Sequence, residues 1–329
     1  MWHAFPVPPD QPFTLKAESV LKTDDGVDIY VHRWRAAVAP KAPSPKAIVQ
    51  IIHGLAEHAG RYAPLAASLN AEGYTVYASD LRGHGRTAQK AADLGFFAAT
   101  DGWRKCLNDL WQVNRLAARE NPGLPIILLG HSMGSTFARQ FMAEHGDSLS
   151  AVILSGSSGQ PNALAQSGRL TARLERMRLG QRGHSKLIQS LTFDAFNKRF
   201  QPSRTPFDWL SRDPAEVDKY VADPLCGFPS STQLWVDMLD AWSALSRSCD
   251  AVPKSLPIYV ISGTHDPVSA GTRALTPMLA QFRSAGLNVE HKFYPEARHE
   301  LLNETNRDEV TEDLIRWLRT VLEKSADTA

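Results

Sequence analysis

A serine with glycines on both sides lies within residues 130–134, which read GHSMG. The apolar stretch 125–129 before it predicts a buried strand, and the pattern over 133–145 predicts a helix. A serine on a strand-to-helix turn has the setting of a nucleophile elbow, where a strained backbone requires small flanking residues. The pattern predicts that the hydroxyl of Ser132 attacks a carbonyl carbon; the alternative is an ordinary turn that contains a serine.

A serine hydroxyl is a weak nucleophile and needs a general base, which in turn needs an acid to orient it. After such an elbow, the acid and then the base follow along the chain, on loops after later strands. Only His291 and His299 lie within or beyond the last predicted strand, 288–294, and His291 is inside it. We therefore predict His299 as the base. Asp266 follows the strand predicted over 257–262 and is the predicted acid.

Attack on a carbonyl creates an oxyanion, which backbone N–H groups stabilise when they point toward it. One donor comes from the residue after the nucleophile, which here is Met133. The second donor is expected from the loop after an early strand, and the strand predicted over 47–52 is followed by Gly54 and Leu55. We predict the N–H of Leu55, because Gly54 allows the backbone to approach closely.

Strand and helix patterns alternate on both sides of this serine, which predicts a mostly parallel central sheet with helices on both faces. The chain opens with a hairpin predicted over 18–35, around an acidic turn that ends in Gly26. Further strands are predicted over 47–52, 74–79, 125–129, 151–155, 257–262 and 288–294, and helices over 61–72, 102–120, 133–145, 271–285 and 308–322.

The alternation stops between residues 156 and 250, where helical patterns continue without a clear strand. We predict a core over 1–155 and 251–329, and an inserted helical cap (lid) over 156–250. One cap helix carries apolar residues on a single face, and this face is expected either to pack the cap on the core or to line a pocket for an acyl chain. The substrate contacts predicted on this face are Trp235, Met238, Leu239 and Trp242.

A basic run occupies residues 169–186, where one acid, Glu175, stands among the cations. Such a run is typical of a solvated helix face. The alternative is transient contact of the cap with anionic head groups at a membrane surface. The cations are Arg169, Arg173, Arg176, Arg178, Arg182 and Lys186.

Composition excludes several classes of function. The net charge of +1 gives no electrostatic footprint for nucleic acid, and no apolar run is long enough to span a membrane. We expect no secretory signal at the N-terminus, and the three distant cysteines predict neither a disulfide framework nor a zinc site. A cytoplasmic protein is expected, with peripheral contact at the inner membrane surface as the alternative. No metal or organic cofactor is required by the chemistry above.

Five spaced stretches of the chain together resemble the α/β-hydrolases of the monoacylglycerol lipase and lysophospholipase group. The stretches are HGLAEHAGRY (53–62), DLRGHGRT (80–87), GHSMGS (130–135), SGTHDPVS (262–269) and YPEARHELLNE (294–304). Residues 196–228 resemble the cap of bacterial members of this group. The resemblance implies an α/β-hydrolase fold, and the family's nucleophile, acid and base fall on Ser132, Asp266 and His299. The chain departs from the family at Ser135, where glycine is usual, and we expect little effect on activity.

The resemblance implies a serine carboxylic ester hydrolase that cleaves monoacyl lipids through an acyl-enzyme, with a small-molecule acyl ester as substrate. Two alternatives stay open. A serine aminopeptidase of the proline iminopeptidase type shares the fold and would need a cap carboxylate for the substrate amine, such as Asp208, Asp213 or Glu216. A general short-chain carboxylesterase is the other. A non-catalytic binding protein is disfavoured because all three catalytic positions are intact.

Overall fold

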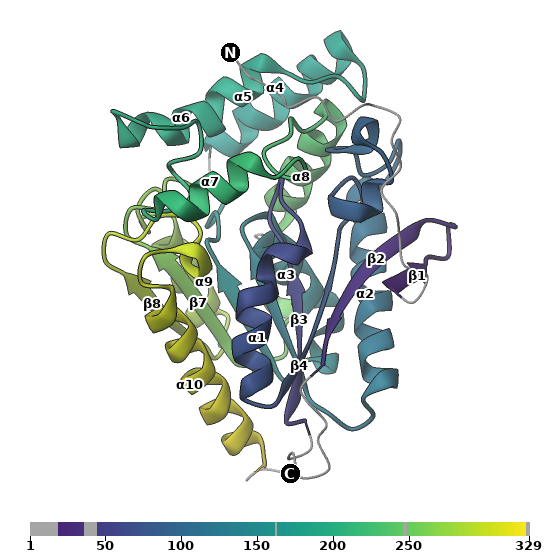
Figure 1. Ribbon diagram of the computed structural model, residues 1–329, viewed down its shortest axis with the longest axis vertical. Coiled ribbons are helices and arrows are strands. Elements are labelled where there is room, and N and C mark those ends of the chain that lie inside the picture. The colour runs from purple at the N-terminus through teal and green to yellow at the C-terminus, as the bar shows by residue number, and fades with distance from the viewer. Residues whose placement is uncertain (1–18, 36–44, 162, 246–248, 327–329) are drawn as a thin grey trace.

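The computed structural model describes residues 19–35, 45–161, 163–245 and 249–326. Eight strands form one sheet in the order β1-β2-β4-β3-β5-β6-β7-β8 (Figure 1). The strands from β3 to β8 are parallel, whereas β2 pairs antiparallel with both β1 and β4. The predicted mostly parallel sheet is confirmed. The strands are β1 (Val20–Lys22), β2 (Asp28–Trp34), β3 (Ala47–Ile52), β4 (Tyr74–Ser79), β5 (Ile126–His131), β6 (Ala151–Ser155), β7 (Ile258–Gly263) and β8 (Val289–Tyr294).

The first two strands form the predicted hairpin, in which Val20 lies opposite Tyr30. Its turn needs a glycine, because Gly26 has a φ of 82°, in the left-handed region that other residues avoid. Residue 18, where the predicted hairpin begins, lies outside the described residues.

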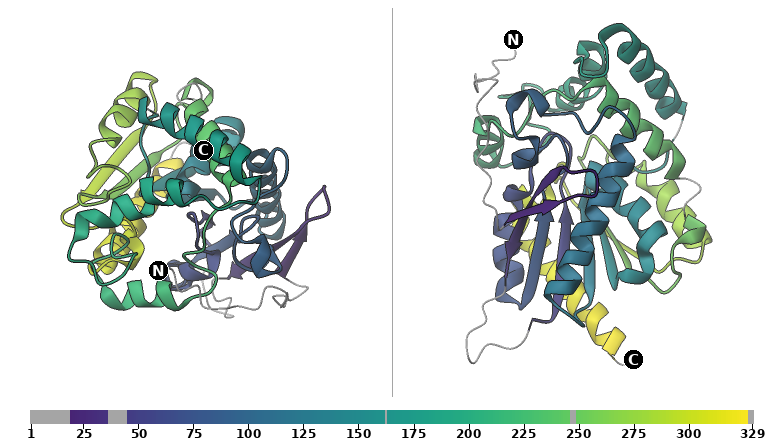
Figure 2. Two further views of the ribbon diagram at one scale, coloured as in Figure 1. Left: turned by 90° about the horizontal axis from the view of Figure 1, so that it is seen from above. Right: turned by 90° about the vertical axis from the view of Figure 1, so that its right-hand side faces the viewer.

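Helices cover both faces of the sheet (Figures 1 and 2). Because side chains alternate along a strand, Ile48 of β3 packs on one face with Phe137, and Val49 packs on the other face with Leu314. Every residue of β3 is buried, as expected for a strand covered on both sides. The helices of the first face are α2 (Gly102–Glu120), α3 (Met133–His145) and α9 (Leu275–Ser284), and those of the second face are α1 (Ala63–Ala71) and α10 (Arg307–Ala326).

A group of helices lies between β6 and β7 in the chain and extends across the upper end of the sheet in Figure 1. Within the described residues this insertion holds no named strand, which agrees with the predicted helical cap. Two of its helices, α4 and α8, pack along each other and are tied by an ion pair between Arg169 and Asp240. The cap helices are α4 (Ala163–Leu179), α5 (Lys186–Leu191), α6 (Phe193–Asn197), α7 (Pro214–Ala222) and α8 (Thr232–Ala244).

Some predicted boundaries are wrong. Helix α9 begins at Leu275 rather than at 271, because Ala270, Gly271 and Thr272 all have positive φ values, between 54° and 69°, and cannot continue a right-handed helix. Strand β5 continues two residues past 129, to His131. None of the helices in the described part of the chain is long and apolar enough to cross a membrane.

Candidate active site

The predicted nucleophile lies between the end of β5 and the start of α3. Ser132 has φ 53° and ψ −119°, a strained backbone conformation for a residue with a side chain. Gly130 and Gly134 must be glycines because there is no room for a Cβ at either position. A Cβ on Gly130 would lie 2.3 Å from the carbonyl oxygen of Gly134, and a Cβ on Gly134 would lie 2.1 Å from that of Ile52. The sequence therefore forms the sharp turn that exposes a serine at the start of a helix.

The structure brings the predicted acid and base together from two loops, one after β7 and one after β8. Nδ1 of His299 lies 3.0 Å from Oδ1 of Asp266, and the carboxylate is fully buried while the histidine is 2% exposed. Because a carboxylate accepts, Nδ1 carries the proton and donates it, which leaves the lone pair on Nε2 of the neutral ring. The backbone N–H of Val268 also donates to Oδ1 of Asp266, at 2.9 Å, and holds the carboxylate in place.

The environment of His299 favours its protonated form. Burial lowers the pKa of His299, but the charge of Asp266 and the hydrogen bond to it outweigh burial, so the pKa lies above the ordinary value of 6.5. The ring of Trp209, from the cap, lies 5.1 Å from the imidazole ring between centroids and shields it from solvent.

A second histidine packs beside the first. The centroids of the His131 and His299 rings are 4.8 Å apart, and a Cβ on Gly156 would lie 3.1 Å from both rings. Because His131 directly precedes Ser132, this contact places the predicted base beside the elbow. Burial and the nearby charge of His299 lower the pKa of His131 to about 4, so this ring stays neutral and does not compete for the proton.

The predicted oxyanion loop follows β3 and lies against the nucleophile. A Cβ on Gly54 would lie 3.2 Å from the Cβ of Ser132, so a side chain at this position would crowd the serine. The loop is held by His53, whose Nδ1 lies 2.8 Å from the carbonyl oxygen of Gly54 and whose Nε2 accepts the N–H of Leu81. The side chain of Leu55 packs against the core cluster and against both apolar clusters of the cap.

The peptide between Ser132 and Met133 is fixed by Ser135. The carbonyl oxygen of Ser132 accepts the N–H of Ser135 at 2.9 Å and its hydroxyl at 2.6 Å. The hydroxyls of Ser135 and Ser157 are 2.8 Å apart, and both residues are buried. In a trans peptide the C=O and the following N–H point in opposite directions, so fixing this oxygen also fixes the N–H of Met133.

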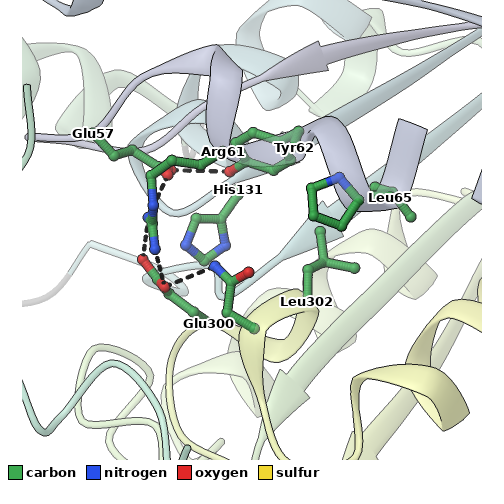
Figure 3. A pocket seen from close by; sticks show the side chains of 9 residues that line it. Glu57, Arg61, Tyr62, Leu65, His131, Glu300 and Leu302 are labelled. Carbon is green, nitrogen blue, oxygen red and sulfur yellow. Dashed lines mark hydrogen bonds and ion pairs between the residues drawn. The ribbon is translucent and has the colours of Figure 1, made fainter. Parts of the chain in front are cut away.

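A charged cluster links the predicted oxyanion loop to the loop of His299 (Figure 3). Arg61 lies between two carboxylates, at 2.7 Å from Glu57 and 2.6 Å from Glu300. Glu57 also accepts the N–H of Gly54 at 2.5 Å. The cluster borders a cavity of about 20 Å³, room for about one water molecule. Sequence reasoning gave no role to Arg61 or Glu300, although one lies in HGLAEHAGRY and the other directly follows His299.

The four substrate contacts predicted on α8 have two different surroundings in the structure. Trp235, Met238 and Leu239 join one apolar cluster of the cap, against which Leu55 also packs. The indole N–H of Trp242, one turn further along, donates to the carbonyl oxygen of Gly159 at 3.1 Å. Three of the four residues therefore lie near the predicted oxyanion loop, whereas Trp242 holds the strand-to-cap linker.

Comparison with known proteins identifies the family to which this chain belongs. A family model described as "Serine aminopeptidase, S33" matches residues 43–306. The chain belongs to this family. The S33-family chain is 32% identical to a monoacylglycerol lipase of Mycolicibacterium smegmatis, over 83% of its own length and 88% of that protein. It is 27% identical to the human monoglyceride lipase, with 86% of each chain covered.

Solved structures agree with the family. The S33-family chain superposes on a thermostable carboxyl esterase from Bacillus coagulans with a TM-score of 0.84 at 28% identity, covering 92% of this chain and 97% of the other. A lipase in an open form gives a TM-score of 0.81 at 26% identity, covering 92% and 98%. The α/β-hydrolase fold with an inserted helical cap is thereby confirmed, and the protein is a hydrolase of the serine ester hydrolase type.

Proposed function

We propose that this S33-family protein hydrolyses the carboxylic ester of monoacyl lipids, with Ser132, His299 and Asp266 as its catalytic residues. The observation that carries the proposal is the hydrogen bond between His299 and Asp266, both buried, beside a serine at the strained turn between β5 and α3. A base, its orienting acid and an elbow serine form the arrangement that acyl transfer requires.

In the proposed reaction, Nε2 of neutral His299 takes the proton of the Ser132 hydroxyl as its oxygen attacks the ester carbonyl. Asp266 keeps the proton on Nδ1 and stabilises the imidazolium that forms. The imidazolium then gives the proton to the leaving alcohol as the ester C–O bond breaks, which leaves an acyl-enzyme on Ser132. Water attacks this acyl group with His299 again as base, and the fatty acid is released.

The tetrahedral intermediate carries a negative oxygen, and we propose that the N–H groups of Leu55 and Met133 stabilise it. The contact of Gly54 with Ser132 supports this role for the loop of Leu55, and the position of Met133 at the first residue of α3 supports the other donor. The N-terminus of α3 adds a favourable dipole at the same place.

The acyl chain is the part of the substrate for which the cap is best suited. The apolar side chains of Trp235, Met238 and Leu239 lie with Leu55 in one cluster, and we propose that the acyl chain contacts these residues. Each methylene removed from water contributes about 0.8 kcal/mol, so four methylenes contribute about 3 kcal/mol. Relatives named monoacylglycerol lipase support a monoacyl substrate.

An aminopeptidase is the second candidate, because the family description names one. It would need a free cap carboxylate for the substrate amine, and each acid predicted from sequence already has a partner. The pairs are Asp208 with Thr205, Asp213 with Arg307, and Glu216 with Lys219. This arrangement favours the ester substrate over the amide.

The test is a comparison of substrates with one enzyme preparation. We expect hydrolysis of monoacylglycerol or lysophospholipid, with p-nitrophenyl esters of graded length reporting the acyl preference, and only trace cleavage of a prolyl amide. A fluorophosphonate should label the wild-type protein and leave the S132A variant unlabelled. Preferred cleavage of the prolyl amide would overturn the proposed substrate, and labelling of S132A would overturn the nucleophile.

We further propose that the cap contacts a membrane surface from the cytoplasm. Leu170, Leu174 and Met177 of α4 recur at helical spacing and are 54–79% exposed, beside the basic run. An amphipathic helix with exposed apolar residues suits a lipid interface. The basic run keeps a net positive charge beside these residues, because Arg169 and Arg173 share a single acid, Asp240. Three unpaired, buried cysteines support a reducing compartment.

Flotation with phosphatidylglycerol vesicles tests the membrane contact. Wild-type protein should float, and a variant that combines L174D with M177D should stay in solution while it still hydrolyses a water-soluble ester. The matched control, V221D, changes an exposed apolar residue on α7 and should still float. Equal flotation of the α4 variant and the control would contradict the proposal.

A further inference from the structure

Three potential metal ligands meet where the cap touches the oxyanion loop. In the part of the chain that the structure describes, His58, Asp223 and Cys226 place one ligand atom each within 4.8 Å of one another. Nε2 of His58 lies 2.9 Å from Oδ2 of Asp223. The histidine follows the oxyanion loop, and the other two residues follow α7, so the cluster joins segments more than 160 positions apart.

The three side chains have the chemistry of a transition-metal site. An imidazole nitrogen, a carboxylate oxygen and a thiolate sulfur are all ligands of Zn²⁺, with bond lengths of about 2.0–2.3 Å. Tetrahedral bonds of that length put ligand atoms about 3.3–3.8 Å apart. The widest pair of ligand atoms, at most 4.8 Å apart, would therefore close by up to about 1 Å, whereas the 2.9 Å separation of His58 and Asp223 would widen slightly. The side chain of Asp223 is 32% exposed, which gives an ion a route to the site and leaves a position for water.

We propose that His58, Asp223 and Cys226 bind one Zn²⁺ or a similar borderline-soft divalent ion, and that binding inhibits the enzyme. The thiol of Cys226 loses its proton to solvent as the Zn–S bond forms, while Asp223 binds as the carboxylate. His58 stays neutral, its proton moving from Nε2 to Nδ1 as the metal takes Nε2. One proton is released for each ion bound, and no electron is transferred.

Inhibition follows from the position of His58 at the start of the turn Ala59–Tyr62. Its Nδ1 accepts the backbone N–H of Gly60 at 3.2 Å and caps this turn. A protonated Nδ1 cannot accept that bond, so metal binding at Nε2 removes the cap. The same turn carries Arg61, whose carboxylate partner Glu57 holds Gly54 of the oxyanion loop.

A direct connection also runs from the cap to that loop. The carbonyl oxygen of Ala56 accepts the hydroxyl of Tyr220 at 2.8 Å and the N–H of Gly227 at 2.9 Å. Closure of Asp223 and Cys226 around an ion would move the segment that makes both bonds. The neighbouring cation Arg61 does not oppose the ion with its full charge, because Glu57 and Glu300 both pair with it.

Metal binding is tested without substrate, on the full chain after treatment with a chelator and in the absence of thiols. Titration of the wild-type protein with Co²⁺ should give one bound ion and a thiolate-to-cobalt absorption band, which Zn²⁺ displaces. C226S and D223N should lose the band or weaken binding at least tenfold. The matched control, C249S, changes another buried free cysteine and should bind as the wild type does.

Inhibition is then measured as the rate with Zn²⁺ relative to the metal-free rate of the same variant. Wild type and C249S should be half-inhibited at the Zn²⁺ dissociation constant, and C226S should need at least ten times more. A cobalt band retained in C226S, or no stoichiometric binding, would overturn the site. Binding without inhibition would overturn the regulatory role. Because binding is read without turnover, its failure is distinguishable from a failure of the proposed ester hydrolysis.

Discussion

Ser135 donates two hydrogen bonds to the carbonyl oxygen of Ser132, from its N–H at 2.9 Å and from its hydroxyl at 2.6 Å. The glycine that is usual in the family at this position could not donate the second of these bonds, because glycine has no hydroxyl. We predict that S135A lowers kcat about 2- to 10-fold with little change in KM, since one hydrogen bond contributes about 0.5–1.5 kcal/mol and this bond orients the N–H of Met133. Steady-state kinetics on a p-nitrophenyl ester measure the effect.

The control for this prediction is S157A, which removes the partner of the Ser135 hydroxyl and keeps the bond to Ser132. Its kcat should fall less than that of S135A. S135T keeps a hydroxyl and should recover part of the rate. A wild-type kcat in S135A would show that the backbone N–H of residue 135 is enough to orient the peptide. That result would agree with the sequence analysis, which expected little effect on activity from serine in place of glycine at this position.

Removal of the Ser132 hydroxyl, the proposed nucleophile, should abolish turnover without unfolding the protein. We expect S132A to lose roughly 10⁶ in kcat, and D266N about 10⁴, because the asparagine holds the wrong tautomer of His299. Circular dichroism and thermal melting should show that both variants fold. Substantial esterase activity in S132A would refute the assigned nucleophile.

The pH dependence of activity should report His299. Its pKa is raised above 6.5 in the folded enzyme, and the base must be neutral, so kcat/KM should rise with pH through this pKa. In D266N the charge that raises the pKa is gone, and the residual activity should show its acid limb at lower pH. An acid limb that does not move in D266N would contradict the assigned acid.

The free energy of unfolding should also depend on pH, through the neighbouring ring of His131. His131 has a folded pKa of about 4, below the ordinary 6.5, so the unfolded state binds more protons and the free energy of unfolding falls as pH drops from about 6.5 toward 4. One such proton contributes about 1.4 kcal/mol per pH unit. Urea unfolding between pH 4 and 7 should show a shallower slope in H131N; an unchanged slope would refute the burial of a neutral ring.

Two glycine-to-alanine substitutions should act in opposite directions. In G134A the new Cβ would lie 2.1 Å from a backbone oxygen, so we expect a loss of about 1–3 kcal/mol or more and reduced activity as the elbow shifts. Gly168 lies in α4 with one ordinary contact at 3.8 Å, and G168A should stabilise the protein by up to about 1 kcal/mol. Thermal melting compares the two, and equal melting temperatures would contradict the packing argument.

Local patterns predicted most of the fold and brought together Asp266 and His299, which the structure pairs. Strand periodicity located β3 to β8, and the chain order of Ser132, Asp266 and His299 followed from the loops of a parallel sheet. The start of α9 was missed because three consecutive positive φ values leave no periodic signal in the sequence.

Contacts between distant segments were out of reach for the same reasoning. Arg61 and Glu300 are 239 positions apart, and nothing in either local pattern predicts that they pair. In the cluster of His58, Asp223 and Cys226, the histidine is likewise 165 positions from the nearer of the other two residues. The sequence predicted no zinc site because the three cysteines lie far apart along the chain. Packing of the cap on the core creates these contacts, and periodicity in one segment does not report the partner of another.

Leu55 connects the cap to the loop beside Ser132, so a change in the cap also changes the surroundings of that loop. Its backbone lies in the loop beside Ser132, while its side chain packs into the core and into both clusters of the cap. A cap transplanted from a relative would therefore bring foreign contacts onto a residue of the loop beside Ser132. Chimeras built to exchange substrate range should work best when the residue at position 55 is taken from the same protein as the cap. Residue 55 and the cap are expected to have changed together during evolution rather than separately.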